Sequence, residues 1–158
     1  MSEQSSDCPA AFFVSVYQIS EVVNPFEDCI WHNVDPPVSI DEIIQAIARD
    51  ELCEIPYSIM LKRHAAECTR SYHIQRIAYL VVYPDDTPIN IDVGVPVCGY
   101  EHASGFEILD GHHRLAAALV RNASDILVTP SGQIDHMFEL FPGCVEIEDD
   151  TQTATFYP

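Results

Sequence analysis

Basic residues are scarce in this sequence, and lysine is almost absent. The chain has 7 lysine and arginine residues against 25 aspartate and glutamate residues, and Lys62 is the only lysine. The resulting net charge of −18 disfavours direct binding to nucleic acid, because such binding depends on cations that neutralise phosphates. The same charge favours contact with a basic protein surface. A basic protein is therefore the macromolecular partner that the composition suggests.

Several other class-defining features are missing as well. No apolar run approaches the roughly 18 residues of a membrane helix, and the first residues lack the basic region of a secretory signal. The six cysteines include no Cys-x-x-Cys pair, so structural zinc is not expected and no metal ligand is predicted. The P-loop pattern is also absent. We therefore expect a cytoplasmic protein with free thiols and no membrane association.

The remaining composition is that of a folded domain. Of the 158 residues, 47% are hydrophobic, which excludes a disordered chain and is enough for a buried core. Neither an internal repeat nor a linker is visible in the sequence. We expect a flexible N-terminus over residues 1–10, one domain over residues 11–143, and an exposed acidic C-terminal tail over residues 144–158.

The residue patterns predict a mixture of strands and helices. Ser39 and Glu42 form a capping-box pattern, followed by isoleucines at helical spacing, which predicts a helix to about residue 50. Further helices are expected at residues 55–66, 115–119 and 136–141. Strands are expected where β-branched and aromatic residues gather, at residues 11–19, 74–83, 89–95, 106–109 and 126–128. The second and third of these strands should form a hairpin, with turns at 84–88, 99–105 and 130–132.

The most informative stretch covers residues 105–119. Residues 106–109 suit a largely buried strand, and residues 115–119 are strong helix formers. Between them, Asp110 suits the N-cap of the helix, and Gly111 tolerates the backbone geometry of a tight turn. The stretch therefore predicts a buried strand, a two-residue turn and a helix.

The start of this helix is a candidate phosphate site. Helix N-terminal amides attract anions, and the side chains of His112, His113 and Arg114 suit phosphate oxygens. Gly111 completes the expected phosphate-binding set, and Asp110, His112 and His113 are the candidate catalytic residues. Adjacent helical residues point about 100° apart, so we expect one imidazole to reach the ligand. The alternative is structural: Asp110 caps the helix, one histidine packs on the sheet, and Arg114 pairs with a surface acid.

The same stretch resembles the signature of the ParB/sulfiredoxin superfamily. In that superfamily a strand leads into Gly-x-x-Arg or Asp-Gly-His-His-Arg and then into an Ala-rich helix, and the element cradles nucleotide phosphates. Its members include CTP-binding partition proteins, ATP-using sulfiredoxins, free-serine kinases, and small nuclease or ATPase proteins of mobile elements. His112 stands where sulfiredoxin-like enzymes have a cysteine, so sulfinic-acid reduction is disfavoured. The resemblance implies a ParB/sulfiredoxin-like fold.

The resemblance also implies a catalytic base. In the kinase-like members this base is an acidic residue of the N-terminal region, and here the candidates are Glu21, Glu27 and Asp28. No local pattern chooses among them. Asp110 could instead bind a metal or handle a proton rather than cap the helix.

One segment departs from both the superfamily pattern and the acidic composition. Residues 53–73 match nothing in the pattern and are interpreted as an insertion. Residues 55–84 are locally basic, with only Glu67 to oppose the cations Lys62, Arg63, Arg70 and Arg76. These cations either form ion pairs with the acidic remainder of the chain or supply positive charge to a bound phosphate or nucleic acid.

The predicted fold class is α/β (α+β), a single compact domain with a small mixed sheet and flanking helices. The predicted function is nucleotide-phosphate binding, with hydrolysis of a nucleoside triphosphate or phosphoryl transfer assisted by Mg²⁺. Two alternatives stay open. One is an acidic, non-catalytic interaction or inhibitor protein of a phage or mobile element that mimics nucleic acid. The other is a ParB-like nuclease. The sequence does not determine the nucleotide, the acceptor or the oligomeric state.

Overall fold

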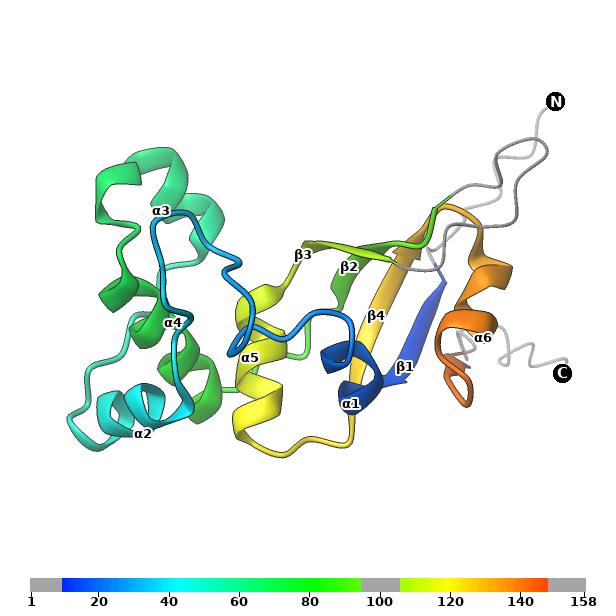
Figure 1. Cartoon of the computed structure of the whole chain (residues 1–158), viewed down its shortest axis with the longest axis horizontal. Coiled ribbons are helices and arrows are strands. Elements are labelled where there is room, and N and C mark those ends of the chain that lie inside the picture. Colours follow the sequence, from blue (N-terminus) through cyan, green and yellow to red (C-terminus); the bar gives the residue numbers. More distant parts are fainter. Residues whose placement is uncertain (1–9, 95–105, 148–158) are drawn as a thin grey trace, which may run out of the picture.

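Five short strands form one mixed sheet in the computed structural model, which describes residues 10–94 and 106–147 (Figure 1). The spatial order is β3-β2-β4-β1-β5. β2 and β4 run parallel, and the other neighbouring strands run antiparallel. The strands are β1 (Ala11–Ser15), β2 (Ile89–Asp92), β3 (Glu107–Asp110), β4 (Asp125–Ser131) and β5 (Val145–Ile147).

Helices flank this sheet in the described part of the chain. The α-helices are α1 (Val16–Ser20), α2 (Ile40–Ala48), α3 (Tyr57–Arg63), α4 (Arg70–Val82), α5 (His112–Val120) and α6 (Met137–Leu140), and short 3-10 helices cover Ala65–Glu67 and Ile134–His136. Figure 1 shows α5 at the junction between the sheet and the helical region of α2, α3 and α4, with α6 toward the other end of the sheet. The predicted single α+β domain with a small mixed sheet and flanking helices is confirmed.

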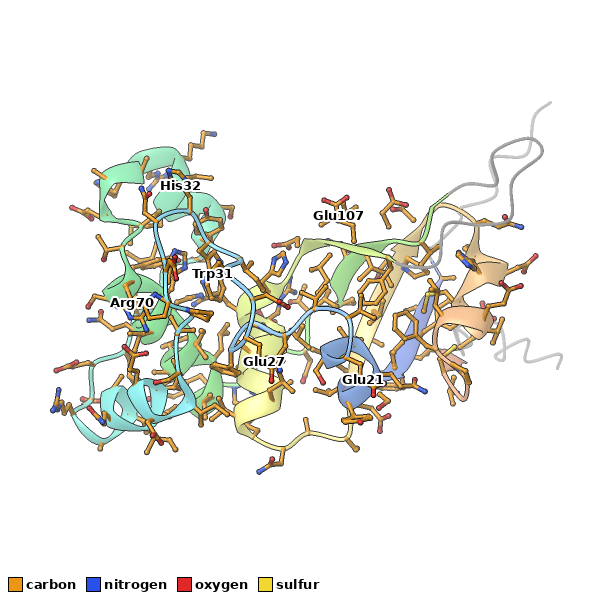
Figure 2. All side chains as sticks on the ribbon, in the orientation of Figure 1. Glu21, Glu27, Trp31, His32, Arg70 and Glu107 are labelled. Carbon is orange, nitrogen blue, oxygen red and sulfur yellow. The ribbon has the colours of Figure 1, made fainter. Side chains whose placement is uncertain are left out.

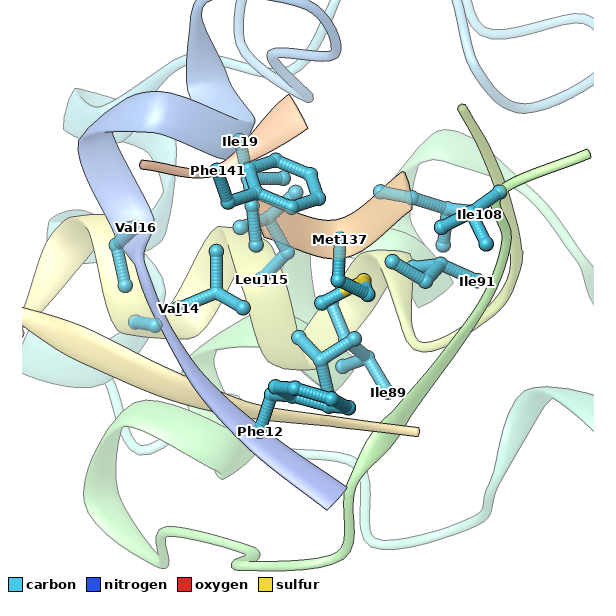
Figure 3. Close-up of a cluster of buried hydrophobic side chains, with 13 residues drawn as sticks. Phe12, Val14, Val16, Ile19, Ile89, Ile91, Ile108, Leu115, Met137 and Phe141 are labelled. Carbon is cyan, nitrogen blue, oxygen red and sulfur yellow. The ribbon is translucent and has the colours of Figure 1, made fainter. Parts of the chain in front are cut away.

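Helix α5 is buried on two sides because it belongs to two hydrophobic clusters. Leu115 and Ala118 pack in the cluster that joins the sheet to α1 and α6, and Figure 3 shows Leu115 among the buried side chains of this cluster. Ala116 and Ala117 pack in the second cluster, with residues of α2 and α4. The small alanine side chains let α4 approach α5 closely. The start of α5 is therefore held between a sheet and a helical layer.

The predicted strand over residues 74–83 is wrong, because residues 74–82 lie in helix α4 and Tyr83 is its C-cap. Thr69 accepts a hydrogen bond from the amide of Tyr72 and caps the helix. The buried positions Tyr72, Arg76 and Leu80 follow one another at four-residue spacing. The predicted hairpin with residues 89–95 is also wrong, since β2 pairs antiparallel with β3 and parallel with β4.

Three other boundaries need correction. The strand expected over residues 11–19 ends at Ser15, whose side chain accepts from the amide of Gln18 and starts α1. The strand at residues 106–109 is not largely buried: β3 is an edge strand in which only Ile108 is buried, and Leu109 is 55% exposed. The turn expected at residues 130–132 begins later, because Ser131 still belongs to β4.

The predicted helix from residue 40 is confirmed, together with its capping box. The amide of Glu42 donates to Ser39 Oγ at 3.2 Å, and the amide of Ser39 donates to the Glu42 carboxylate at 2.8 Å. The helices expected within residues 55–66 and 136–141 are present as α3 and α6. The strand expected at 126–128 is present within β4, and the strand expected at 89–95 is present as β2 but ends earlier, at Asp92.

The chain ends and the segment before β3 fall largely outside the described residues. The expected flexible N-terminus lies there except for residue 10, as do residue 95, the turn at 99–105 and residues 148–158 of the acidic tail. The described part of that tail includes the exposed strand β5, which pairs with β1.

No helix in residues 10–94 and 106–147 has the length and apolar character needed to cross a membrane. Within the same ranges, the cysteines Cys29, Cys53, Cys68 and Cys144 are free thiols.

Candidate functional site

The turn between β3 and α5 leaves the start of the helix without a side-chain cap. Gly111 is the N-cap residue, with φ of +115°, and no side chain of the described residues bonds the first amides. The amide of Leu115 makes the first intrahelical bond, to the Gly111 carbonyl at 2.9 Å. The predicted N-cap role of Asp110 is therefore wrong. Its carboxylate binds the Arg114 guanidinium instead, with 2.9 Å between Oδ2 and NH2.

A cleft of about 520 Å³ opens at this helix start. Its walls come from the 30–32 loop, the beginning of α3, helix α4, Asp85 and residues 109–114. Figure 2 shows Trp31 between the helical region around α4 and helix α5, with His32 farther out toward α3. The structure thus brings the predicted residues Asp110, Gly111, His112, His113 and Arg114 to one cleft.

Arg76 of α4 supplies a buried cation to this cleft. Its residue surface is 8% exposed, and its NH1 donates to the carbonyl of Glu54 at 2.7 Å. Its guanidinium also lies 5.5 Å from the centre of the Tyr79 ring. No carboxylate among the described residues forms an ion pair with Arg76. The charge of Arg76 helps to lower the pKa of Asp85, but no carboxylate of the described residues binds the guanidinium directly, so an anion in the cleft would be stabilised.

Arg114 has most of its hydrogen-bonding capacity in use. Its NH1 donates to the carbonyls of Thr87 and Pro88 at 2.8 Å and 3.1 Å, and its NH2 binds Asp110. The side chain is only 12% exposed. Arg114 therefore connects α5 to the segment that enters β2, and Asp110 offsets part of its positive charge.

The two adjacent histidines of the motif have different surroundings. His113 is buried, and its Nε2 lies 2.9 Å from Nδ1 of His73 on α4. The indole of Trp31 stacks on both imidazoles, with ring centres 4.6 Å and 4.7 Å apart. Burial lowers the pKa of His73 to about 4, and it lowers the pKa of His113 well below its ordinary value. Both imidazoles are therefore neutral at physiological pH.

His112 is half-buried and lines the cleft. Burial lowers the pKa of its imidazole, and the nearby carboxylates of Asp110 and Glu107 oppose this shift. Of the two motif histidines, His113 therefore packs against α4 with a ring nitrogen bonded to His73, whereas His112 stands at the cleft surface.

The cleft contains two carboxylates, Asp85 and Asp110. The hydroxyl and the amide of Thr87 both donate to Asp85 Oδ1, at 2.6 Å and 2.9 Å, and these bonds lower the pKa of Asp85. The sequence pattern around Asp85 indicated only a turn. Its place in the cleft depends on the packing of α4 against α5.

The acidic residues proposed as a base lie elsewhere. Glu21, Glu27 and Asp28 do not line the cleft, and the Asp28 carboxylate accepts from the amide of Asn24 at 2.8 Å. Glu27 lines a separate groove near the start of α2. Asp85 and Asp110, rather than these three, are therefore the carboxylates that line the cleft among the described residues.

The cations of the locally basic segment have different roles: some lie on the surface, as the ion-pair interpretation predicts, and one lines the cleft. Arg70 forms an ion pair with Glu42 at 2.7 Å, as a surface ion-pair role predicts. Lys62 and Arg63 are exposed and do not line the cleft. Arg76 does line it. A single cation from residues 55–84 thus reaches the candidate phosphate site within the described chain.

A dedicated metal centre is not visible in residues 10–94 and 106–147, which contain no group of three or more His, Cys, Asp or Glu arranged around a common point. Mg²⁺ in nucleotide sites is usually held by one or two carboxylates together with phosphate oxygens. Asp85 and Asp110 are the carboxylate-bearing residues among the described lining of the cleft.

Two residues central to this site, His73 and Arg76, were not among the predicted site residues. The sequence shows Arg76 only as part of a basic segment, and His73 is the last residue of the predicted insertion over residues 53–73, directly before the strand expected at 74–83. The His73 and His113 rings are 40 residues apart in the sequence, so no local sequence pattern could have predicted their contact.

Comparisons with protein-family models, with curated proteins and with solved structures found no match for this chain. The resemblance to the ParB/sulfiredoxin superfamily therefore stays a prediction that rests on residues 105–119.

Proposed function

We propose that the cleft at the start of α5 binds the phosphate groups of a nucleoside triphosphate. The observation that carries this proposal is Arg76, a buried guanidinium that forms no direct ion pair with a carboxylate of the described chain and lines the same cleft as the start of α5. Helix N-terminal amides and a guanidinium are both suited to phosphate oxygens. The volume of about 520 Å³ also lies within the usual range of small-molecule sites.

The proposed reaction is hydrolysis of the nucleotide or transfer of its phosphoryl group. Such reactions depend mainly on positioning and on neutralising charge. Gly111 lets the chain enter α5 beside the phosphates, and Arg76 and Arg114 supply positive charge. Asp85 and Asp110 would hold Mg²⁺ together with the phosphate oxygens. When bound, the ion supplies charge neutralisation.

His112 is the proposed proton-handling group. It is half-buried in the cleft wall, and burial lowers its pKa, so the neutral imidazole predominates near neutral pH. One ring nitrogen of His113 is hydrogen-bonded to His73. His113 is therefore proposed to act without contacting the ligand. A reduced, cytoplasmic setting is part of the same proposal.

The test is calorimetric titration of ATP, CTP and GTP, each with Mg²⁺, into wild type and into Arg76→Gln. Glutamine removes the charge and keeps a polar side chain. We expect one nucleotide to bind wild type and Arg76→Gln to weaken its affinity by about tenfold or more. Arg49→Gln is the matched control, because Arg49 is exposed and does not line the cleft. Equal affinities of the two variants would contradict the site, and no binding to wild type would contradict the function.

A second candidate function, acidic contact with a basic protein, has its own support. The described residues contain two arginine–carboxylate ion pairs, Arg70–Glu42 and Arg114–Asp110. Most carboxylates of a chain with net charge −18 are thus not neutralised by arginine. The test is titration of the protein into a basic, sequence-nonspecific DNA-binding protein, with duplex DNA as competitor. A complex of fixed stoichiometry that persists at about 0.15 M salt would support mimicry of nucleic acid. Loss of binding at that salt concentration would contradict it.

A further inference from the structure

The imidazoles of His73 and His113 form an in-plane hydrogen-bonded pair. Their planes differ by 13°, their ring centres lie 5.1 Å apart, and His73 Nδ1 is 2.9 Å from His113 Nε2. The nitrogen–nitrogen distance is shorter than two rings stacked face to face would allow. It is the length of a good hydrogen bond. The pair therefore lies edge to edge, and the indole of Trp31 stacks on both rings.

We propose that His73 is a positioning residue, which sets the tautomer of His113 and thereby the orientation of the first turn of α5. The consequence for ligand binding rests on the proposed function, whereas the effect on His113 does not. The bond joins two helices, because His73 belongs to α4 and His113 to α5.

The tautomers of the two rings are linked because each neutral imidazole has one N–H and one acceptor nitrogen. When His73 donates, His113 Nε2 accepts, and the proton of His113 lies on Nδ1. When His113 donates, its Nδ1 is left as an acceptor. Both rings are buried, at 1% and 8% exposure, so bulk water cannot easily replace the partner. Whether His73 donates or accepts therefore determines whether Nδ1 of His113 is a donor or an acceptor.

The surroundings of the pair favour one fixed arrangement. Tyr57 of α3 and Tyr72 of α4 stand at steep angles to the rings, between 52° and 78°. The positive charges of Arg76 and Arg114 disfavour protonation of His113. Protonation of either ring would place a further cation in a space enclosed by aromatic side chains. The pair is consequently held neutral and in plane.

The position of His113 in α5 explains why its ring matters to the site. It is the second residue of a helix whose first amides have no side-chain cap. In the described chain, the first turn is anchored by the His113–His73 bond, by Arg114 and by the fit of Gly111 against Ile89. Loss of the His73 bond would loosen the amides that face the cleft.

Two substitutions separate the hydrogen bond from packing. His73→Leu fills a similar volume without a polar atom, and His73→Asn places an amide group close to the position of Nδ1. Ile77→Val is the matched control for general loss of stability in α4, since Ile77 is fully buried on the same helix and belongs to the cluster behind it. Urea unfolding identifies any variant that fails to fold.

The primary measurement is ¹⁵N NMR of the imidazoles and of the amides of residues 111–114 in the ligand-free protein. We expect one neutral tautomer of His113 in wild type, a mixture of tautomers in His73→Leu with shifted and broadened amides, and restoration of a single tautomer in His73→Asn. Ile77→Val should leave these signals unchanged. If His113 keeps the wild-type tautomer and the amides keep their shifts in His73→Leu, the proposal is overturned.

The secondary measurement is nucleotide affinity of the same variants. We expect about a tenfold loss in His73→Leu and recovery to within about threefold of wild type in His73→Asn. Absence of nucleotide binding in wild type would remove the proposed function, and the NMR result would still decide the role of His73. Normal affinity in His73→Leu, with altered His113 signals, would overturn the link between this pair and the site.

Discussion

Gly111 lies directly against Ile89, the first residue of β2. A Cβ atom built on Gly111 would collide with Cγ2 of Ile89 and lie 2.7 Å from its Cβ, and Ile89 is fully buried. The N-cap position of α5 therefore has no room for a side chain. This close approach is what brings the helix start to the edge of the sheet and into the wall of the cleft.

Gly111→Ala should destabilise the protein by about 2–4 kcal/mol, because the added methyl group overpacks against Ile89 and the backbone has φ of +115°. The free energy of unfolding in urea measures the effect. Gly143→Ala is the control, since Gly143 also has a positive φ of +86° but nothing lies within 4 Å of its Cβ position. We expect this control to cost about 1 kcal/mol. Equal losses in both variants would contradict a steric role of Ile89.

Asp110→Asn should separate the two roles left to Asp110, the ion pair with Arg114 and assistance to catalysis. The substitution releases the guanidinium of Arg114, so binding of Mg²⁺-free nucleotide should become a few-fold tighter. Any Mg²⁺-dependent turnover should fall by about tenfold or more, because one of two cleft carboxylates is lost. Asp86→Asn is the control, since Asp86 neighbours Asp85 but does not line the cleft. Unchanged turnover in Asp110→Asn would contradict a catalytic role and leave Asp110 only its ion pair with Arg114.

Acid should destabilise the protein between about pH 6.5 and pH 4. Burial lowers the pKa of His73 from 6.5 to about 4, and the pKa of His113 moves in the same direction. In this window the unfolded chain binds protons that the folded chain does not, so stability is full above pH 6.5 and falls as the pH drops toward 4. Each pKa unit of separation corresponds to about 1.4 kcal/mol.

Fluorescence of Trp31, the only tryptophan of the chain, can follow unfolding at each pH. His73→Leu should flatten the pH dependence in this range. His64→Leu should leave it unchanged, because His64 is exposed. A pH dependence that is the same in His73→Leu and wild type would show that the buried pair does not cause it.

Glu42 should contribute to stability through both the capping box and Arg70. The Arg70 guanidinium binds both carboxylate oxygens, with Nε–Oε1 at 2.9 Å and NH2–Oε2 at 2.7 Å, and lowers the pKa of Glu42 to about 2. Glu42→Gln keeps an acceptor for the Ser39 amide and should cost about 0.5–1 kcal/mol. Glu42→Ala removes both contacts and should cost about 1–2 kcal/mol. Urea unfolding measures both variants, and a larger loss in Glu42→Gln would contradict the capping contribution.

Sequence patterns predicted the local elements well where a residue type has one characteristic structural role, such as capping a helix. Ser39 and Glu42 predicted the start of α2, and the glycine before two histidines predicted the entry to α5. Such signals depend on bonds between near neighbours, which the sequence displays directly. The misassigned strand over residues 74–83 shows the limit of composition: isoleucine, tyrosine and valine suit strands, but here their helical spacing buries one face of α4 against α2 and α5.

The sequence by itself determined that residues 110–114 form a turn into a helix and that several groups suited to phosphate gather there. Only the tertiary structure decided which of these groups are free for a ligand. Asp110 pairs with Arg114 instead of capping the helix, and His113 turns to His73. Arg76 reaches the same cleft from α4, because that helix packs on α5. These contacts join residues far apart in the chain, and their partners are set by packing rather than by spacing.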